Sequence, residues 1–274
     1  MRKLAQLKNK VCLIGGKGQV VLDSANSLLR KNILSKIILL EENNQVVKKF
    51  NDITYHYSIK KFENIIKKLK EFNINKVLII GYVDLPKLHQ INFNIKSKLF
   101  FTKNYFINNE SSQTKILKKF LLSKNIQLLS PIKFLDELLI SSYDEIKLKN
   151  FEKYKNILIS NINNLKKITS INIGQSLIMN GERILALENY QGTNKMIEIF
   201  NNNKSFNELI FVKFKKINQI NEVDFPVIGP ETIRKLIKIK IKAIVLFKNQ
   251  TLIVDKIKCI KLLKNNNINL IVIK

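Results

Sequence analysis

Short apolar runs typical of β-strands alternate with amphipathic helical patterns along the first half of the chain. In one of these helical patterns, residues 59–72, apolar side chains recur every three or four positions and Ser58 is placed to cap the first turn. Strands that alternate with helices in this way form a parallel sheet with helices on both faces. We therefore expect strands at 11–14, 36–40, 53–57, 76–80 and 126–129, with helices at 20–31, 59–72 and 113–124.

The second half of the chain has a different pattern, which begins with a hairpin. Asn180 and Gly181 lie between apolar runs at 173–179 and 183–187, and an Asn-Gly pair in that position is a strong hairpin signal. Beyond the hairpin we expect a helix opened by Thr193, a strand at 209–214, a polar loop at 215–228, a helix from Pro230, a strand pair at 243–247 and 251–254, a helix capped by Asp255, and a strand at 269–273.

The length of 274 residues favours two domains. A helical, connective stretch over residues 131–167 is broken at Ser141, and we place the domain boundary there. The sequence thus predicts an α/β protein, with a Rossmann-like parallel-sheet domain at 1–141 and a separate α/β domain at 142–274.

The composition is strongly basic, with a formal net charge of +27. Such a charge is typical of proteins that bind nucleic acid or an anionic membrane surface. Here the lysines are spread over almost every segment together with asparagine and isoleucine, and no arginine-rich block or aromatic RNA-binding pattern is present. We therefore expect no nucleic-acid partner.

The location of the protein is constrained by what the sequence lacks. No apolar stretch approaches the roughly 20 residues that a membrane span needs, and the apolar run at 11–14 is too short for the core of a signal peptide. Cys12 and Cys259 lie far apart and without metal-binding spacing, which fits a reducing compartment. We expect a cytoplasmic protein that is at most peripheral to a membrane.

A glycine-rich turn, Gly15-Gly16-Lys17-Gly18, follows the first expected strand. Glu41-Glu42 follows the second strand at about the distance of a ribose-binding acid, which favours a dinucleotide site, but Val21 replaces the third glycine of that fingerprint. Three interpretations stay open: a dinucleotide site, a purely structural tight turn, and a close approach of the backbone to another nucleotide or phosphate at Gly15, Gly16 and Gly18.

The second half is rich in lysine, asparagine and isoleucine, but two islands contain glycine, glutamine, threonine and acidic residues as well. These islands lie at 174–175 with 188–193 and at 213–232. Cations, an amide, a carboxylate and a helix-opening glycine within a short stretch can hold a phosphorylated ligand and a metal. We take Asp224, Lys213 and Lys216 as candidate catalytic residues, because lysines neutralise phosphate oxygens and Asp224, together with Glu188, can bind the metal. The candidate ligand-binding residues of these islands are Gly174, Gln175, Gly192, Thr193, Gln219, Gly229 and Thr232.

Each of these residues also has a structural interpretation. Asp224 can hydrogen-bond to nearby amides of its loop, Glu188 can be an exposed carboxylate at a strand end, and the two lysines can be solvated like their many neighbours. The glycines at 192 and 229 can simply cap helices.

The second half contains, in order, the phrases Ile173-Gly174-Gln175-Ser176, Glu188 with Gln191-Gly192-Thr193-Asn194, Phe211-Val212-Lys213, Lys216 with Gln219 and Asp224-Phe225-Pro226, and Ile228-Gly229-Pro230-Glu231-Thr232. These phrases resemble the UDP-2,3-diacylglucosamine pyrophosphatase family of the alphaproteobacterial lipid A pathway. In the first half the resemblance rests on the glycine-rich turn, on residues 81–86 and on the order of strands and helices.

The resemblance implies a Rossmann-like first domain, a distinct α/β second domain, a homodimer, and a divalent metal such as Mg²⁺ or Mn²⁺. It also implies that water attacks the α-phosphate of UDP-2,3-diacylglucosamine to give UMP and 2,3-diacylglucosamine 1-phosphate. The partners would then be this nucleotide-sugar lipid and the surface of the inner membrane.

The chain departs from the family pattern at several acids. The family's Glu-Gly-Thr-Asp is Gln191-Gly192-Thr193-Asn194 here, and Ile217, Ile220 and Glu222 stand where the family has proline, aspartate and arginine. A Gly-Asp-Asp signature falls on Asn109-Glu110-Ser111. Either the retained acids suffice for the metal, or this copy is impaired.

Three functions therefore remain open from the sequence. The first is a metal-dependent pyrophosphatase acting on UDP-2,3-diacylglucosamine. The second is a non-catalytic relative that binds the nucleotide-sugar lipid or its product, which the lost acids favour. The third is a Rossmann oxidoreductase that uses the glycine-rich turn, although the sequence offers no candidate acid or base for hydride transfer.

Overall fold

The computed structural model describes residues 10–83, 90–104, 113–170, 174–202, 205–215, 222 and 225–273. The chain divides into two compact units. Unit 1 comprises Met1–Asp136 with Ile220–Asp224, and unit 2 comprises Glu137–Gln219 with Phe225–Lys274. The expectations for residues 109–111, Lys216, Ile217, Gln219, Ile220 and Asp224 lie outside the described residues.

Unit 1 is built on a five-stranded sheet whose strands are all parallel, as the alternation of strands and helices predicts. The strand order is β3-β2-β1-β4-β5. The chain therefore leaves β1 toward one edge and returns to β4 on the other side, so its winding direction reverses between β1 and β4. The strands are β1 (Val11–Gly15), β2 (Leu34–Leu39), β3 (Thr54–His56), β4 (Lys76–Ile80) and β5 (Gln127–Leu128).

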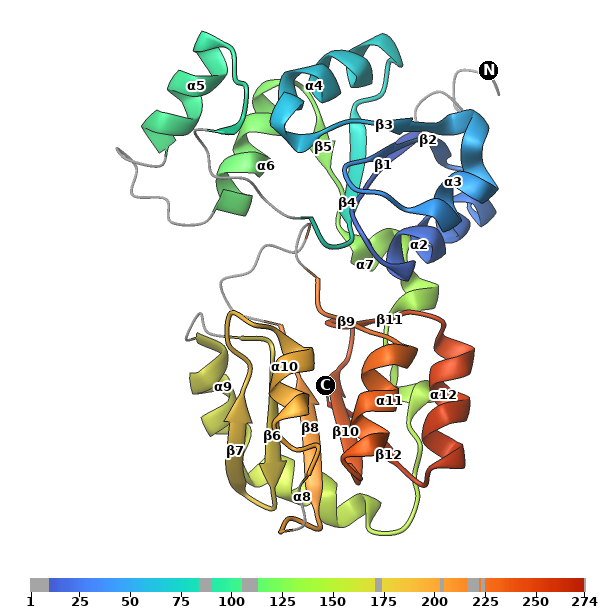
Figure 1. Cartoon of the computed structure of the whole chain (residues 1–274), viewed down its shortest axis with the longest axis vertical. Coiled ribbons are helices and arrows are strands. Elements are labelled where there is room, and N and C mark those ends of the chain that lie inside the picture. Colours follow the sequence, from blue (N-terminus) through green and yellow to red (C-terminus); the bar gives the residue numbers. More distant parts are fainter. Residues whose placement is uncertain are drawn as a thin grey trace. The chain divides into compact units, whose positions relative to one another are not determined.

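Helices cover both faces of this sheet (Figure 1). On one face, Cys12 and Ile14 of β1 share a core with α4 and α6, and on the other face α2 packs against β1, β2 and β4. The expected helix at 59–72 begins with a 3₁₀ turn at Ile59–Lys61, where the Ser58 hydroxyl accepts from the Lys60 amide. The helices are α2 (Gln19–Arg30), α3 (Asn44–Phe50), α4 (Phe62–Glu71), α5 (Ile95–Thr102), α6 (Gln113–Ser123) and α7 (Pro131–Phe134).

Unit 2 contains a separate, mixed sheet with the order β12-β10-β8-β6-β7. β12, β10 and β8 are parallel, whereas β6 runs antiparallel to both β8 and β7. The predicted hairpin joins β6 to β7, and its Gly181 has the positive φ of 57° that favours glycine. The strands are β6 (Ser176–Asn180), β7 (Arg183–Leu187), β8 (Leu209–Lys213), β10 (Ala243–Phe247) and β12 (Asn269–Ile273). β1 and β8 therefore belong to different sheets, as a two-domain chain requires.

Alternate residues of these strands enter two different cores. Ile244 and Leu246 of β10 lie in the core formed with α10, α11 and α12, while Ala243 and Val245 lie in the core formed with α8 and α9. This is the two-residue side-chain period of a strand that is buried on both faces. The helices are α8 (Phe151–Ser160), α9 (Ile162–Ser170), α10 (Thr193–Glu198), α11 (Pro230–Lys238) and α12 (Lys256–Asn265).

Two expectations for unit 2 are wrong. The segment at 251–254 does not pair with β10; instead β11 (Leu252–Ile253) pairs in parallel with β9 (Val227–Ile228), because the chain leaves the main sheet at a turn where Asn249 has a φ of 58°. Asp255 stands at the start of α12 but makes no capping hydrogen bond with its side chain, because its backbone is left-handed rather than in the β region that N-cap residues use.

Among the described residues, no helix combines the length and the apolar character that crossing a bilayer would require.

The segment that leads into unit 2 is tied to the start of α12 by Lys256. Its ammonium donates to the Leu139 carbonyl at 2.8 Å and to Asp144 Oδ2 at 2.9 Å. The same carboxylate oxygen accepts from the backbone amide and the hydroxyl of Ser141, both at 2.8 Å. Since all these groups are partly buried, removing the ammonium leaves a carbonyl and a carboxylate without their cation.

We expect Lys256→Ala to lower the free energy of unfolding of unit 2 by about 1–3 kcal/mol, because buried acceptors lose their donor. Hydrogen exchange of the buried amides of β8 and β10 measures the opening of this unit. The matched control is Lys258→Ala, since Lys258 is half exposed and reaches Asp255 only at 3.8 Å; its expected cost is under about 0.5 kcal/mol. Equal effects of the two substitutions would contradict the role given to Lys256.

Candidate functional site

The glycine-rich turn of unit 1 lies at the carboxyl end of β1, where the winding of the sheet reverses. Its backbone is paired with the segment after β4. The Gly16 amide donates to the Ile80 carbonyl at 3.0 Å, and Lys17 exchanges two hydrogen bonds with Tyr82, at 2.7 and 3.1 Å. The amides of Gly16 and Lys17 are thus committed to protein carbonyls.

Packing within unit 1 accounts for the glycines of this turn. A Cβ at Gly16 would stand 2.1 Å from the Tyr82 carbonyl oxygen, and one at Gly15 would stand 2.4 Å from Val21 Cγ1. Gly18 has a φ of 102°, which side chains disfavour. Glu41, expected near a ribose, forms an ion pair with Lys17 at 3.6 Å. The structural interpretation of the turn therefore has direct support, and its role in ligand binding stays a prediction.

One edge of the unit 2 sheet brings together five described residues of the second-half islands: Gly174, Gln175, Glu188, Thr193 and Lys213. β8 ends at Lys213, β7 ends just before Glu188, and antiparallel β6 begins there with Ser176, which is the register partner of Lys213. α10 begins at the same edge with Thr193. The carboxyl ends of parallel strands are where α/β folds place their ligands.

Four side chains form a connected group at this edge, which we call the strand-end cluster: Ser176, Glu188, Thr193 and Lys213. Ser176 Oγ lies 2.5 Å from Glu188 Oε2 and 3.3 Å from Thr193 Oγ1. Lys213 Nζ donates to Thr193 Oγ1 at 3.1 Å. Ser176 has no exposed surface and Lys213 is only 5% exposed, so two hydroxyls link a buried ammonium to a carboxylate.

The chemistry of the groups fixes the direction of these hydrogen bonds. An ionised carboxylate only accepts, so the single proton of Ser176 goes to Glu188. Lys213 only donates, so the oxygen of Thr193 accepts from it and the Thr193 proton is left for Ser176. The polarity runs from Lys213 through Thr193 and Ser176 to Glu188.

Gly174 allows the backbone to position Glu188. A Cβ there would stand 2.1 Å from the Glu188 carbonyl oxygen and 2.6 Å from its Cβ. The adjoining Gln175 amide donates to Glu188 Oε2 at 3.1 Å, and the Gln175 carbonyl accepts from Phe214. Glycine at 174 is therefore required by the close approach of two protein segments.

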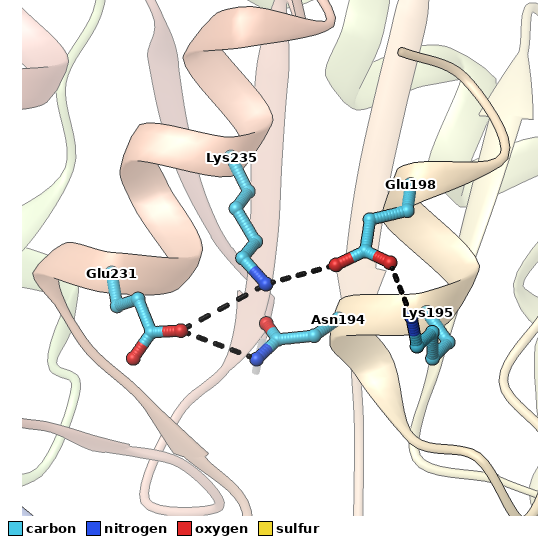
Figure 2. Close-up of polar contacts among 5 residues, drawn as sticks. All are labelled: Asn194, Lys195, Glu198, Glu231 and Lys235. Atoms are coloured by element: carbon cyan, nitrogen blue, oxygen red, sulfur yellow. Dashed lines mark hydrogen bonds and ion pairs between the residues drawn. The ribbon is translucent and has the colours of Figure 1, made fainter.

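The helices α10 and α11 are braced by a polar network, which Figure 2 shows. Lys235 of α11 reaches Glu198 at 3.2 Å and Glu231 at 3.8 Å, while Asn194 Nδ2 donates to Glu231 at 3.4 Å. Lys195 donates to Glu198 at 2.9 Å. Hydrogen bonds from Lys195 and then from Lys235 hold the pKa of the Glu198 carboxyl below its usual range. The brace fixes the start of α10 relative to the start of α11, which carries Thr232 in its first turn.

The two glycines that open these helices differ in what requires them. Gly192 has a φ of 87°, so its backbone favours glycine. Gly229 has an extended backbone, with a φ of −147°, and a Cβ there would meet only Val254, at an ordinary 3.5 Å. Neither the backbone nor the packing demands glycine at 229.

The structure thus joins several residues singled out from the sequence: Gly174, Gln175, Glu188, Thr193 and Lys213, with Ser176 between Glu188 and Thr193. Gly229 and Thr232 lie at the start of α11, which the brace connects to α10. Sequence reasoning did not select Ser176 as a site residue. Its signal was a hydroxyl at the head of an otherwise apolar strand. Lys216, Gln219 and Asp224 lie outside the described residues.

The described part of the chain brings no three histidine, cysteine, aspartate or glutamate side chains together as a metal site. Glu188 is the carboxylate of the strand-end cluster, and the hydroxyls of Ser176 and Thr193 stand beside it. Oxygen donors of this kind suit a hard divalent cation, which takes several such ligands.

Comparison with known families covers both units. The LpxI N-terminal domain model matches residues 10–138, and the LpxI C-terminal domain model matches residues 147–271. The two matches together span most of the chain. A search of curated proteins finds no match to it.

We expect Gly229→Ala and Gly174→Ala to affect stability very differently. At 229, the loss of chain entropy in the unfolded state stabilises by about 0.4–1 kcal/mol, and alanine at a helix start costs a similar amount, so the net change should stay within about 0.5 kcal/mol. At 174, the overlap with the Glu188 backbone should cost about 1–3 kcal/mol. Urea denaturation measures both, and a large loss at 229 would show that the fold needs that glycine.

Proposed function

Because this chain belongs to the LpxI family, we propose that it hydrolyses UDP-2,3-diacylglucosamine in the synthesis of lipid A. The observation that carries the proposal is the strand-end cluster. Residues scattered over 176–213 in the sequence meet there as one buried cation, two hydroxyls and one carboxylate. The buried ammonium of this cluster suits a diphosphate ligand, since the ligand's negative charge must be neutralised before its anhydride bond is attacked.

In the proposed reaction, water attacks the α-phosphorus of the substrate. The new bond joins the water oxygen to that phosphorus, and the bond from the phosphorus to the bridging oxygen breaks. The uridine side leaves as UMP, and the bridging oxygen leaves with the β-phosphate as 2,3-diacylglucosamine 1-phosphate. Phosphoryl transfer of this kind depends mainly on positioning and charge neutralisation.

The chain's own residues have distinct parts in this proposal. Lys213 neutralises phosphate oxygens as a buried point charge. Thr193 and Ser176 connect its ammonium to Glu188 by hydrogen bonds. The backbone amides at the start of α11 follow Gly229, and amides at a helix start can bind an anion. Lys216, Gln219 and Thr232 are proposed to contact the same diphosphate, and Gln175 with Gly192 to border it.

We propose that Asp224 and Glu188 hold a divalent cation, Mg²⁺ or Mn²⁺. Such an ion, when bound, lowers the pKa of a water molecule and neutralises phosphate charge. The support for it is the oxygen-rich donor set around Glu188 and the position of Asp224 in the motif that resembles the pyrophosphatase family.

The N-terminal unit has a strand order that matches the first strands of Rossmann-like folds, and we propose that it binds part of the nucleotide near Gly15, Gly16 and Gly18. Because the amides of Gly16 and Lys17 are already used, contacts from this turn would come from Gly18 and the start of α2. The cytoplasmic location, the homodimer and the absence of a nucleic-acid partner stay predictions.

One observation favours a second candidate, in which the chain binds the nucleotide-sugar lipid without hydrolysing it. Gln191 and Asn194 are amides where the family has acids, and Asn194 serves in the brace between α10 and α11. An acid that contributed to catalysis would be missing at both positions.

We expect the purified protein to release UMP from UDP-2,3-diacylglucosamine, and EDTA to stop the release. In ¹⁸O-labelled water the label should appear in UMP, because attack occurs at the α-phosphorus. Mass spectrometry of both products measures this. Label found only in the lipid phosphate would contradict the site of attack, and binding without turnover under Mg²⁺ or Mn²⁺ would establish the second candidate.

We expect Asp224→Ala to lower kcat by about 10²-fold or more while the Kd of the substrate changes little, because a metal acts mainly on the transition state. The comparison variant is Asp255→Ala, which removes a carboxylate that pairs with Lys258 at the start of α12. That variant should keep the wild-type kcat. An Asp224→Ala protein that melts normally and turns over at the wild-type rate would move the metal site away from Asp224.

A further inference from the structure

α5 of unit 1 exposes apolar side chains on its outer face. Ile95 is 80% exposed and Leu99 is 64% exposed, and the four-residue spacing places them one turn apart on the same side of the helix. The opposite side is buried through Ser97 and Phe101, which packs with Phe93 and Phe120. The helix therefore has two faces with apolar side chains, of which one packs into the core and the other is exposed.

Lysines flank the exposed apolar ridge on both sides. At 100° per residue, Ile95 and Leu99 lie within about 40° of each other, with Lys98 on one side and Lys96 and Lys103 on the other. All three lysines are exposed, and the sequence from Gln90 to Asn104 contains no aspartate or glutamate. An apolar ridge between cationic borders is the pattern of helices that lie in a membrane interface.

Another exposed isoleucine shows that this pattern is not general in the chain. Ile257 of α12 is 74% exposed, but its neighbours Lys256 and Lys258 form ion pairs with Asp144 and Asp255. Its helix buries Cys259 and Leu263 in the core, and Ile260 and Leu262 pack against the core. Exposure alone therefore does not distinguish α5; the paired ridge with an all-cationic border does.

We propose that the outer face of α5 docks this chain onto an anionic phospholipid surface, with Ile95 and Leu99 entering the interfacial layer and Lys96, Lys98 and Lys103 on the headgroup phosphates. The proposal rests on the proposed function for its purpose, because that substrate carries two acyl chains and would be met at a bilayer. Its structural support is α5 alone.

A second copy of the chain fits this face less well than a lipid surface does. Two copies joined through α5 would bring the two sets of lysines together without an acidic residue from either helix. Like charges at such a contact repel, whereas anionic headgroups attract each lysine. The net charge of +27 acts in the same direction.

The chain contains no tryptophan, so a single introduced tryptophan reports its own surroundings. In the full-length Leu99→Trp protein, vesicles of phosphatidylethanolamine with phosphatidylglycerol should shift the emission to shorter wavelength, and brominated lipid should quench it. Pure phosphatidylcholine vesicles should have a much weaker effect. The matched control is Ile257→Trp, a site that is 74% exposed, against 64% for Leu99, and its emission should not change with either lipid.

Sedimentation with the same vesicles gives the strength of binding. Leu99→Asp should lower the partition coefficient about tenfold or more, and Lys98→Gln should lower it about fivefold. Ile257→Asp should leave it unchanged. Circular dichroism checks that the exposed substitutions preserve the fold.

The outcomes separate this proposal from the proposed function. Leu99→Asp should hydrolyse substrate dispersed in detergent at the wild-type rate but lose activity on substrate embedded in anionic vesicles. Vesicle binding that survives Leu99→Asp, an Ile257→Trp signal equal to that of Leu99→Trp, or a Leu99→Trp shift that depends on protein concentration without lipid would each overturn the docking face. Failure of hydrolysis in every preparation would count against the proposed function. The vesicle-binding results would still show whether the outer face of α5 binds an anionic lipid surface.

Discussion

The burial of the Lys213 ammonium at the edge of the unit 2 sheet is the constraint around which the candidate site is built. A buried cation needs dipoles or anions nearby, and the register of β6 against β8 places Ser176 directly opposite it. Thr193, at the start of α10, supplies the oxygen that accepts from Lys213. Hydrogen bonds that lead from the Lys213 ammonium therefore hold Thr193, in the first turn of α10, and Glu188 in place.

Different physical reasons require glycine at different positions of this chain, and the structure distinguishes between these reasons. Gly16 and Gly174 are needed because two protein segments approach closely, and Gly192 because of its positive φ. At Gly229, neither a close approach of another segment nor a positive φ requires glycine. The sequence pattern left a structural and a ligand-binding interpretation open at all of these positions, and the glycine that the fold does not need is the better candidate for ligand binding.

Local periodicity predicted most of the elements well. β4, β7, β10 and β12 begin and end where the apolar runs do, and the hairpin at Gly181 follows from one dipeptide. Strand partners could not be predicted in the same way, since the pairing of β11 with β9 depends on a turn at Asn249 that carries the chain out of the sheet. Ser176 was not selected as a site residue, because its importance lies in the residue that it faces across the sheet. Lys216, Gln219 and Asp224 lie outside the described residues, so their roles stay predictions from the sequence.

Asn194 is an amide where the family resemblance implies an acid, and this residue helps to hold two helices together. A carboxylate at that position, 3.4 Å from Glu231, would require a shared proton, because two ionised carboxylates repel at such a distance. An amide carries no charge at any ordinary pH and supplies the proton donor itself. The contact between α10 and α11 at this point therefore forms without the uptake of a proton, so it does not depend on acidic solution.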